Sequence, residues 1–298
     1  MMSRIFTSLG IGLLTLLGKL PYSFVARFGE ALGSLLYRIP SSRREVVRAN
    51  LRLCFPEKSA AEIEAMSHET FRKVFRSLAE GGIFWTCGED KMRRLVQIDD
   101  QANLPALDGT PHILVTPHLS GLEAGAIRLT MHLRDTVGRS GASLYTVQKN
   151  ELFDNFLKVA RGRFGANMIS RNDSARSILR VLKQGEALQL ISDMDFGPRD
   201  SEFIPFFGAP ALTLTVVSRL ARASGAQVVP IYTEQLPDYK GYVLHILPAW
   251  DNYPGESVTE DTRRMNQFFE DAIRPRVADY YWVHKRFKHR PPGEPDIY

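Results

Sequence analysis

The spacing of apolar residues changes character near residue 95. Before that point apolar positions recur at helical spacing, and after it short apolar runs alternate with helical segments. Strands are predicted at 112–116, 143–147, 167–170, 187–192, 226–232 and 242–247. Helices are predicted between them at about 121–133, 151–161, 174–184, 212–224 and 259–278. Strands that alternate with helices favour an α/β fold, with a sheet flanked by helices.

The helical region before residue 95 contains a clear start signal. Ser59 and Glu62 have the spacing of a capping box, in which two otherwise unpaired backbone N–H groups gain acceptors. The apolar residues that follow share one helix face, and Gly81-Gly82 is expected to end this helix. We predict three regions, which are a membrane-associating helical segment (1–38), a helical subdomain (39–94) and an α/β domain (95–298).

The first twenty residues combine an apolar run with flanking basic side chains. Residues 5–17 are the most apolar part of the chain. The basic residues of the first 52 positions are Arg4, Lys19, Arg27, Arg38, Arg43, Arg44, Arg48 and Arg52. The run is short for a membrane span, and no A-x-A cleavage site follows it. We expect an uncleaved helical hairpin on an anionic membrane surface, and a helix that simply packs on the domain is the alternative.

Composition narrows the class of protein further. The 298 residues are 44% hydrophobic and 24% charged, which is typical of a globular chain, and the formal net charge is +5. No run of eighteen uncharged apolar residues exists, so a polytopic transporter is excluded. Cys54 and Cys87 are too few for a disulfide framework and fit a reducing compartment.

Several common site motifs are absent. The chain has no phosphate-binding P-loop, dinucleotide-binding glycine motif, G-x-S-x-G or H-E-x-x-H. His284 and His289 lie among lysines and arginines, a cationic setting that opposes metal binding, so no metal site is predicted. The basic residues are divided between the two ends of the chain without a nucleic-acid motif, so no nucleic-acid partner is expected.

One histidine follows a predicted buried strand and has a carboxylate nearby. His118 stands after the strand 112–116, and Glu123 comes five residues later, beyond Gly121. If Glu123 begins the next helix, its carboxylate can hold one imidazole nitrogen and leave the other to accept a proton from a hydroxyl. The pattern predicts a His118–Glu123 acid–base pair. The spacing is common by chance, and a histidine that caps the strand beside a solvated glutamate is the alternative.

Further segments occur in a fixed order along the chain. They are Leu144–Asn150 with Arg161-Gly-Arg163, Gly165–Arg171, Asp193–Gly197, Phe203–Ala211 and Tyr281–Gly293. Together with His118 and Glu123, this ordered set resembles the bacterial lipid A biosynthesis (lauroyl/myristoyl) late acyltransferase family, within the glycerolipid acyltransferase superfamily. Two positions depart from the family pattern. Ser120-Gly121-Leu122 replaces a common Gly-Asn-Trp, and Met194 replaces a glutamine.

The resemblance implies a fold, a reaction and a set of site residues. It implies a glycerolipid-acyltransferase-like sheet flanked by helices, with an N-terminal helical membrane-associating subdomain. The implied donor is acyl-acyl carrier protein, and the implied acceptor is a hydroxyl of a Kdo-lipid A precursor at the cytoplasmic face of the inner membrane. No cofactor is implied. His118 and Glu123 would be catalytic, and the substrate-binding residues would be Lys149, Asn150, Arg171, Asp193 and Asp195.

Plainer interpretations remain for several of these segments. Asp193 and Asp195 could cap a turn after a strand, and Arg171 could belong to a turn and helix cap. The aromatic residues of the 203–211 segment could be ordinary core or a wall for an acyl chain. The alternative functions are an acyltransferase for a glycerolipid or ornithine-lipid acceptor, and a non-catalytic membrane-peripheral protein that binds lipid.

Overall fold

Helices form the first part of the chain, as the apolar spacing predicts. The computed structural model describes residues 2–102, 104, 110–139 and 141–298. The first helices are α1 (Met2–Lys19), α2 (Tyr22–Tyr37), α3 (Ser42–Cys54), α4 (Ala60–Phe84) and α5 (Glu89–Leu95). The Ser59–Glu62 capping box is confirmed at the start of α4. The predicted end at Gly81-Gly82 is wrong, because α4 continues to Phe84.

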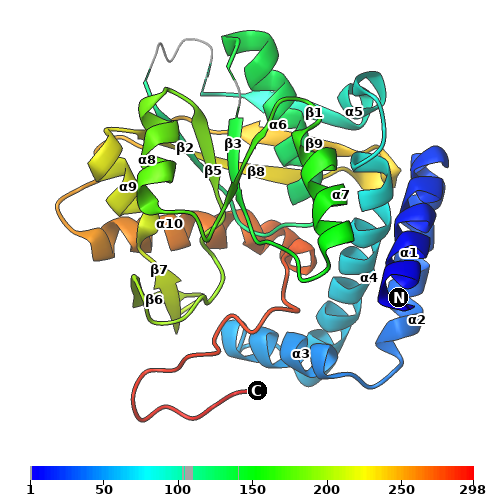
Figure 1. The fold of residues 1–298 in the computed structure, drawn as a ribbon. Helices are drawn as coiled ribbons and strands as arrows, with labels where there is room; N and C mark the ends of the chain where they lie inside the picture. The colour runs from blue at the N-terminus through cyan, green and yellow to red at the C-terminus, as the bar shows by residue number, and fades with distance from the viewer. Residues whose placement is uncertain (1, 103, 105–109, 140) are drawn as a thin grey trace.

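The second part of the chain forms a twisted sheet of seven strands (Figure 1). Their order in space is β1-β9-β8-β2-β5-β3-β4, and all neighbours are parallel except β8 and β9. The strands are β1 (Val96–Asp100), β2 (His112–Val115), β3 (Gly141–Tyr145), β4 (Asn167–Ser170), β5 (Ala187–Leu190), β8 (Gln227–Gln235) and β9 (Tyr242–Ile246). A mostly parallel sheet flanked by helices confirms the α/β prediction.

Two features of this part of the chain were not predicted. Strand β1 is one of them, and the other is a separate antiparallel hairpin of β6 (Ser201–Phe206) and β7 (Ala209–Leu214). The helix predicted at 212–224 begins only at Val216, because residues 212–214 pair with β6.

Helices cover both faces of the sheet (Figure 1). The remaining helices are α6 (Leu122–Val137), α7 (Glu151–Gly162), α8 (Ala175–Lys183), α9 (Val216–Ser224) and α10 (Val258–Ile273). Side chains alternate along β2, so Ile113 and Val115 join the core under α8, α9 and α10, while Leu114 joins the core under α6. The carboxyl ends of the parallel strands are therefore left between two packed layers, which is where ligand sites form in such sheets.

Helices α1 and α2 each pack against α4 through small residues. A methyl group at Gly29 of α2 would lie 2.6 Å from Cα of Arg76, and one at Gly82 of α4 would overlap the carbonyl oxygen of Leu14. Buried Arg76 donates hydrogen bonds to Glu30 of α2 and Glu80 of α4 at 2.9 and 2.8 Å. These contacts fix α1 and α2 on α4. Within the described residues, we find no helix with the length and apolar character that crossing a bilayer requires.

Candidate active site

Two adjacent parallel strands bring His118 and Asp193 together. Strand β2 leads to His118 and strand β5 leads to Asp193, and the pairing of these strands extends past their ends through a 3.1 Å hydrogen bond from Thr116 N to Leu190 O. Fully buried Asp193 then accepts two hydrogen bonds from His118. The backbone N donates to Oδ2 at 2.7 Å, and imidazole Nδ1 lies 2.5 Å from Oδ1.

The environment of Asp193 keeps its carboxyl group ionised. Burial raises the pKa of this carboxyl, but the charge of the His118 imidazole and the two hydrogen bonds lower it more, so the pKa lies below its ordinary value. An ionised carboxylate can only accept, so Nδ1 must carry a hydrogen, and in the neutral imidazole Nε2 then has its lone pair free. No residue in the described part of the chain forms a hydrogen bond with Nε2 of His118. His118 therefore has the form of a general base.

Asp195, two residues further on, is held by the C-terminal segment. Its carboxylate accepts from the backbone N of His289 at 2.9 Å and lies 2.8 Å from Nδ1 of the same residue. The Asp195 backbone N donates to Nε2 of His284 at 3.3 Å. Burial lowers the pKa of His284 to about 4, so this imidazole is neutral at neutral pH and its nitrogen can accept.

Glu123 begins α6 as predicted, but its partners differ from the expected one. Trp85 Nε1 donates to Glu123 Oε2 at 2.9 Å, and Arg161 of α7 donates Nε to the same oxygen at 3.1 Å and Nη2 to Oε1. The predicted contact between Glu123 and the His118 imidazole is therefore wrong. Asp193 holds Nδ1 of His118, because the parallel pairing of β2 and β5 places it there, while Glu123 holds Arg161.

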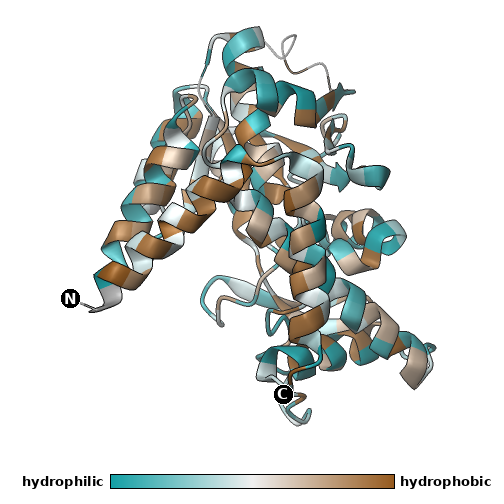
Figure 2. Ribbon diagram, turned by 90° about the vertical axis from the view of Figure 1, so that its right-hand side faces the viewer, coloured by the Kyte–Doolittle hydropathy of each residue, from teal (hydrophilic) through white to brown (hydrophobic). Residues whose placement is uncertain are grey.

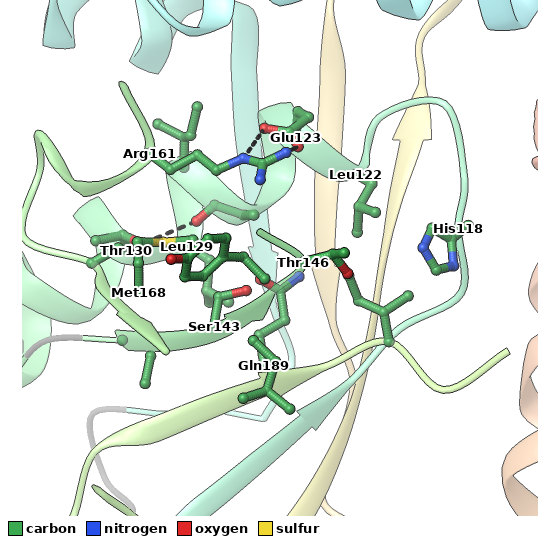
Figure 3. A pocket seen from close by; sticks show the side chains of 18 of the residues that line it. His118, Leu122, Glu123, Leu129, Thr130, Ser143, Thr146, Arg161, Met168 and Gln189 are labelled. Atoms are coloured by element: carbon green, nitrogen blue, oxygen red, sulfur yellow. Dashed lines mark hydrogen bonds and ion pairs between the residues drawn. The ribbon is translucent and has the colours of Figure 1, made fainter. Parts of the chain in front are cut away.

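A cavity of about 440 Å³ extends from His118 along the α6 face of the sheet (Figure 3). Figure 3 shows His118 at one side and Leu129, Thr130 and Met168 at the opposite side, with the Glu123–Arg161 pair above the cavity. Its floor follows β3 from Tyr145 to Gly141, a length of roughly 13 Å at about 3.3 Å per residue. Most of its lining is apolar, with the polar side chains of Thr130, Ser143 and Gln189 among it.

Comparison with known proteins points to one family. The bacterial lipid A biosynthesis acyltransferase family matches residues 1–289. The lipid A biosynthesis lauroyltransferase of Escherichia coli (strain K12) is 34% identical over 295 residues, which cover 98% of this chain and 94% of the relative. The palmitoleoyltransferase of the same organism is 32% identical with the same coverage. The lipid A biosynthesis myristoyltransferase of Escherichia coli (strain K12) is 29% identical over 292 residues, which cover 96% of this chain and 88% of the relative.

The chain belongs to the lipid A biosynthesis acyltransferase family. This confirms the family resemblance seen in the sequence, and it makes the protein an acyltransferase. The 440 Å³ cavity that ends at His118 is within the usual size range for a small-molecule site.

The remaining predicted site residues of this acyltransferase lie outside the cavity lining. Asn150 caps α7 by accepting from Phe153 N at 3.1 Å, and it donates to Thr7 of α1 at 2.7 Å. Lys149 is exposed beside it. Arg171 is exposed after β4, with its guanidinium 4.1 Å from the ring centroid of Phe196. A role for these side chains in substrate binding stays a prediction.

Two of the three phenylalanines in the 203–211 segment belong to the core, and Phe203 is exposed. Phe206 and Phe207 are buried and pack on Trp282 at ring-centroid distances of 6.5 and 5.9 Å. Within the described residues neither lines the cavity. The interpretation as an acyl-chain wall is therefore wrong for these two residues, and the core interpretation is confirmed.

Several site residues were missed by the sequence analysis. Arg161 and Tyr281 line the cavity, although the sequence showed them only as parts of longer segments. His284 and His289 were considered as metal ligands rather than as partners of Asp195. The one available signal was that both histidines and the Asp193-Met194-Asp195 stretch lie in segments of the family pattern.

The neutral state of buried His284 predicts how stability depends on pH. In the unfolded chain this histidine takes up a proton near its ordinary pKa of about 6.5, while the folded protein resists protonation until about pH 4. The unfolded state thus binds more protons between these values, so the free energy of unfolding should fall as pH drops from 6.5 to 4. The loss from this group can reach about 1.4 kcal/mol per pH unit.

Urea unfolding at several pH values checks this prediction. His284→Gln keeps an acceptor but cannot titrate, so its free energy of unfolding should fall less than that of the wild type over the same pH range. Parallel pH profiles for the two proteins would show that His284 is not held neutral.

Proposed function

We propose that this acyltransferase moves a fatty acyl chain from acyl-acyl carrier protein to a hydroxyl of a Kdo-lipid A precursor. The single observation that carries the proposal is the His118–Asp193 pair at the mouth of an elongated cavity. Such a pair activates an alcohol without a protein nucleophile, and the thioester supplies the leaving group. The family and the names of its lauroyl, palmitoleoyl and myristoyl relatives support a fatty acyl donor and a lipid A acceptor.

The proposed reaction proceeds in two steps at His118. Nε2 takes the proton of the acceptor hydroxyl while its oxygen attacks the thioester carbonyl carbon. Asp193 stabilises the imidazolium that forms. The carbon–sulfur bond then breaks, the ester remains on the acceptor, and the imidazolium returns its proton to the departing thiolate.

Arg161 is proposed to stabilise the oxyanion of the tetrahedral intermediate. Of the described side chains that line the cavity, Arg161 is the one with a permanent positive charge. Glu123 fixes two of its N–H groups, so the guanidinium is oriented before substrate binds. In this proposal Glu123 acts on the catalytic chemistry through Arg161 rather than through the imidazole.

The cavity along β3 is proposed to hold the donor acyl chain. Its roughly 13 Å length and mostly apolar lining suit a fatty chain whose thioester carbon stays near His118. We also propose that the exposed Lys149 and Arg171 attract anionic groups of the substrates or the acidic carrier protein, an effect on association rate that salt would weaken.

We propose membrane attachment through α1 and α2 because of their exposed apolar side chains. Figure 2 shows hydrophobic positions along the helix that begins at the N-terminus. The exposed apolar residues of α1 and α2 are Ile5, Phe6, Leu9, Leu13, Leu16, Phe24, Phe28 and Leu35. Their burial in lipid, together with the basic residues of the same region, would hold the enzyme on an anionic bilayer. We propose the cytoplasmic face of the inner membrane as its location.

The first prediction of this proposal concerns turnover. His118→Ala should lower kcat by about three orders of magnitude, because the general base is lost. Asp193→Asn should lower kcat by about two orders or more, because an amide can donate to Nδ1 and favour the wrong imidazole tautomer. The assay is transfer from lauroyl-acyl carrier protein to a Kdo-lipid A precursor in detergent, with circular dichroism as the control for folding. Near-normal turnover by His118→Ala would refute the mechanism.

The second prediction concerns membrane binding. Replacing Phe6, Leu9 and Leu13 together by Gln should release most of the protein from anionic vesicles, because each apolar side chain contributes roughly 1.5–3 kcal/mol when buried. These residues are more than half exposed, so the fold should be retained. Phe203→Gln on β6 is the control and should still sediment with the vesicles. If the triple variant remains fully bound at high salt, the attachment lies elsewhere.

A further inference from the structure

A second cavity meets the first one at His118. It measures about 150 Å³ and lies on the side of His118 that faces α4. Val74, Ser77 and Leu78 of α4 form one wall, and Leu119 and Leu122 form the other. We refer to this cavity as the α4 groove. Because His118, Leu122, Glu123 and Tyr281 line both cavities, the two meet at the imidazole.

The frame of the α4 groove is fixed by hydrogen bonds. Ser77 Oγ donates to the Ser120 carbonyl at 2.8 Å, and Ser120 donates its backbone N and its hydroxyl to the Asp279 carbonyl at 2.8 and 3.0 Å. The Asp279 carboxylate lies 3.4 Å from Lys73 Nζ. The Ser77 and Ser120 hydroxyls are satisfied within the protein, and the buried Asp279 Oδ1 has only the Lys73 ion pair. Val74, Leu78, Leu119 and Leu122 offer an apolar surface beside His118.

One end of the groove lies near the helices that carry the exposed apolar side chains. Leu78 is 55% exposed on α4. Gly82, one helical turn further along α4, is where α1 makes its close contact at Leu14. An apolar chain that leaves a bilayer beside α1 therefore meets Leu78 before it reaches His118.

The reaction requires two chains to meet at one imidazole. In the proposed function the donor brings its chain to the carbonyl carbon, and the family resemblance implies an acceptor hydroxyl that is carried on an existing acyl chain of the lipid. The 440 Å³ cavity suits the whole donor chain, while the α4 groove is shorter and its Leu78 wall is half exposed. We propose that the α4 groove binds the hydroxylated acyl chain of the lipid acceptor and presents its hydroxyl to Nε2 of His118. This inference rests on the proposed function.

Two-substrate kinetics in detergent test the proposal. The probes are lauroyl-acyl carrier protein and a Kdo-lipid A precursor that carries hydroxyacyl chains. Leu78→Gln should raise the acceptor KM about tenfold, because a polar amide replaces half-buried apolar surface against the chain. Leu78→Trp should raise it as well, because the larger side chain fills the groove. The donor KM should change less than twofold in both variants, since Leu78 does not line the donor cavity.

Leu35→Gln is the matched control. Leu35 is 57% exposed on α2 and does not line the α4 groove within the described residues, so its replacement removes the same kind of surface without touching the groove. Its acceptor KM should stay within twofold of the wild type. An equal rise in the control would mean that Leu78 acts through general attachment to lipid, which overturns the proposal.

The outcomes also separate this inference from the proposed function. If the wild type transfers laurate but neither Leu78 variant changes the acceptor KM, the acceptor chain binds elsewhere and the inference fails alone. If the donor KM rises instead, the two chains are assigned to the wrong cavities. If the wild type transfers no acyl group to this acceptor, the proposed function fails and the inference fails with it.

Discussion

The site depends on the buried carboxylate of Asp193. This carboxylate orients the His118 imidazole and is itself held by hydrogen bonds from His118. Asp193 has no exposed surface, and its two oxygens accept from the backbone and the imidazole of His118. A buried charge without such partners would cost several kcal/mol, so the folded chain keeps His118 and Asp193 together. The same contact fixes the imidazole tautomer and leaves Nε2 without a hydrogen-bond partner among the described residues. The contact that stabilises the buried Asp193 charge therefore also orients the His118 imidazole for the proposed catalysis.

The C-terminal segment and helix α3 support the His118–Asp193 contact from outside the sheet. Tyr281 N donates to the His118 carbonyl at 3.0 Å, and Asp195 is held by His289. The C-terminal segment is fixed in turn by Asn50 of α3, whose Nδ2 donates to the carbonyls of Trp282 and His284 at 2.7 and 2.8 Å. The helical region before the sheet therefore contributes directly to the geometry of the site, although none of the residues of α3 lines either of the two cavities within the described chain.

Local signals in the sequence predicted most elements but not the partners of the site residues. Capping at Ser59 and the apolar runs of β2 and β5 can be recognised because they depend on neighbours in the chain. The Asp193–His118 contact joins residues 75 positions apart, and it follows from which strands are adjacent, which periodicity does not encode. Glu123 was paired with His118 because the two are close in sequence, whereas Arg161 and Trp85 reach it only in the folded chain. The β6–β7 hairpin was missed because residues 212–214 continue without a break into the apolar pattern of α9.

Asp193, and not Glu123, holds the Nδ1–H of His118. NMR of the full-length protein with ¹⁵N-labelled histidine can test this contact, with the His118 signals assigned by their loss in His118→Ala. We expect the Nδ1–H tautomer for the neutral imidazole, with signals that change in Asp193→Asn and stay in place in Glu123→Gln. An Nε2–H tautomer, or signals that change in Glu123→Gln but not in Asp193→Asn, would contradict it.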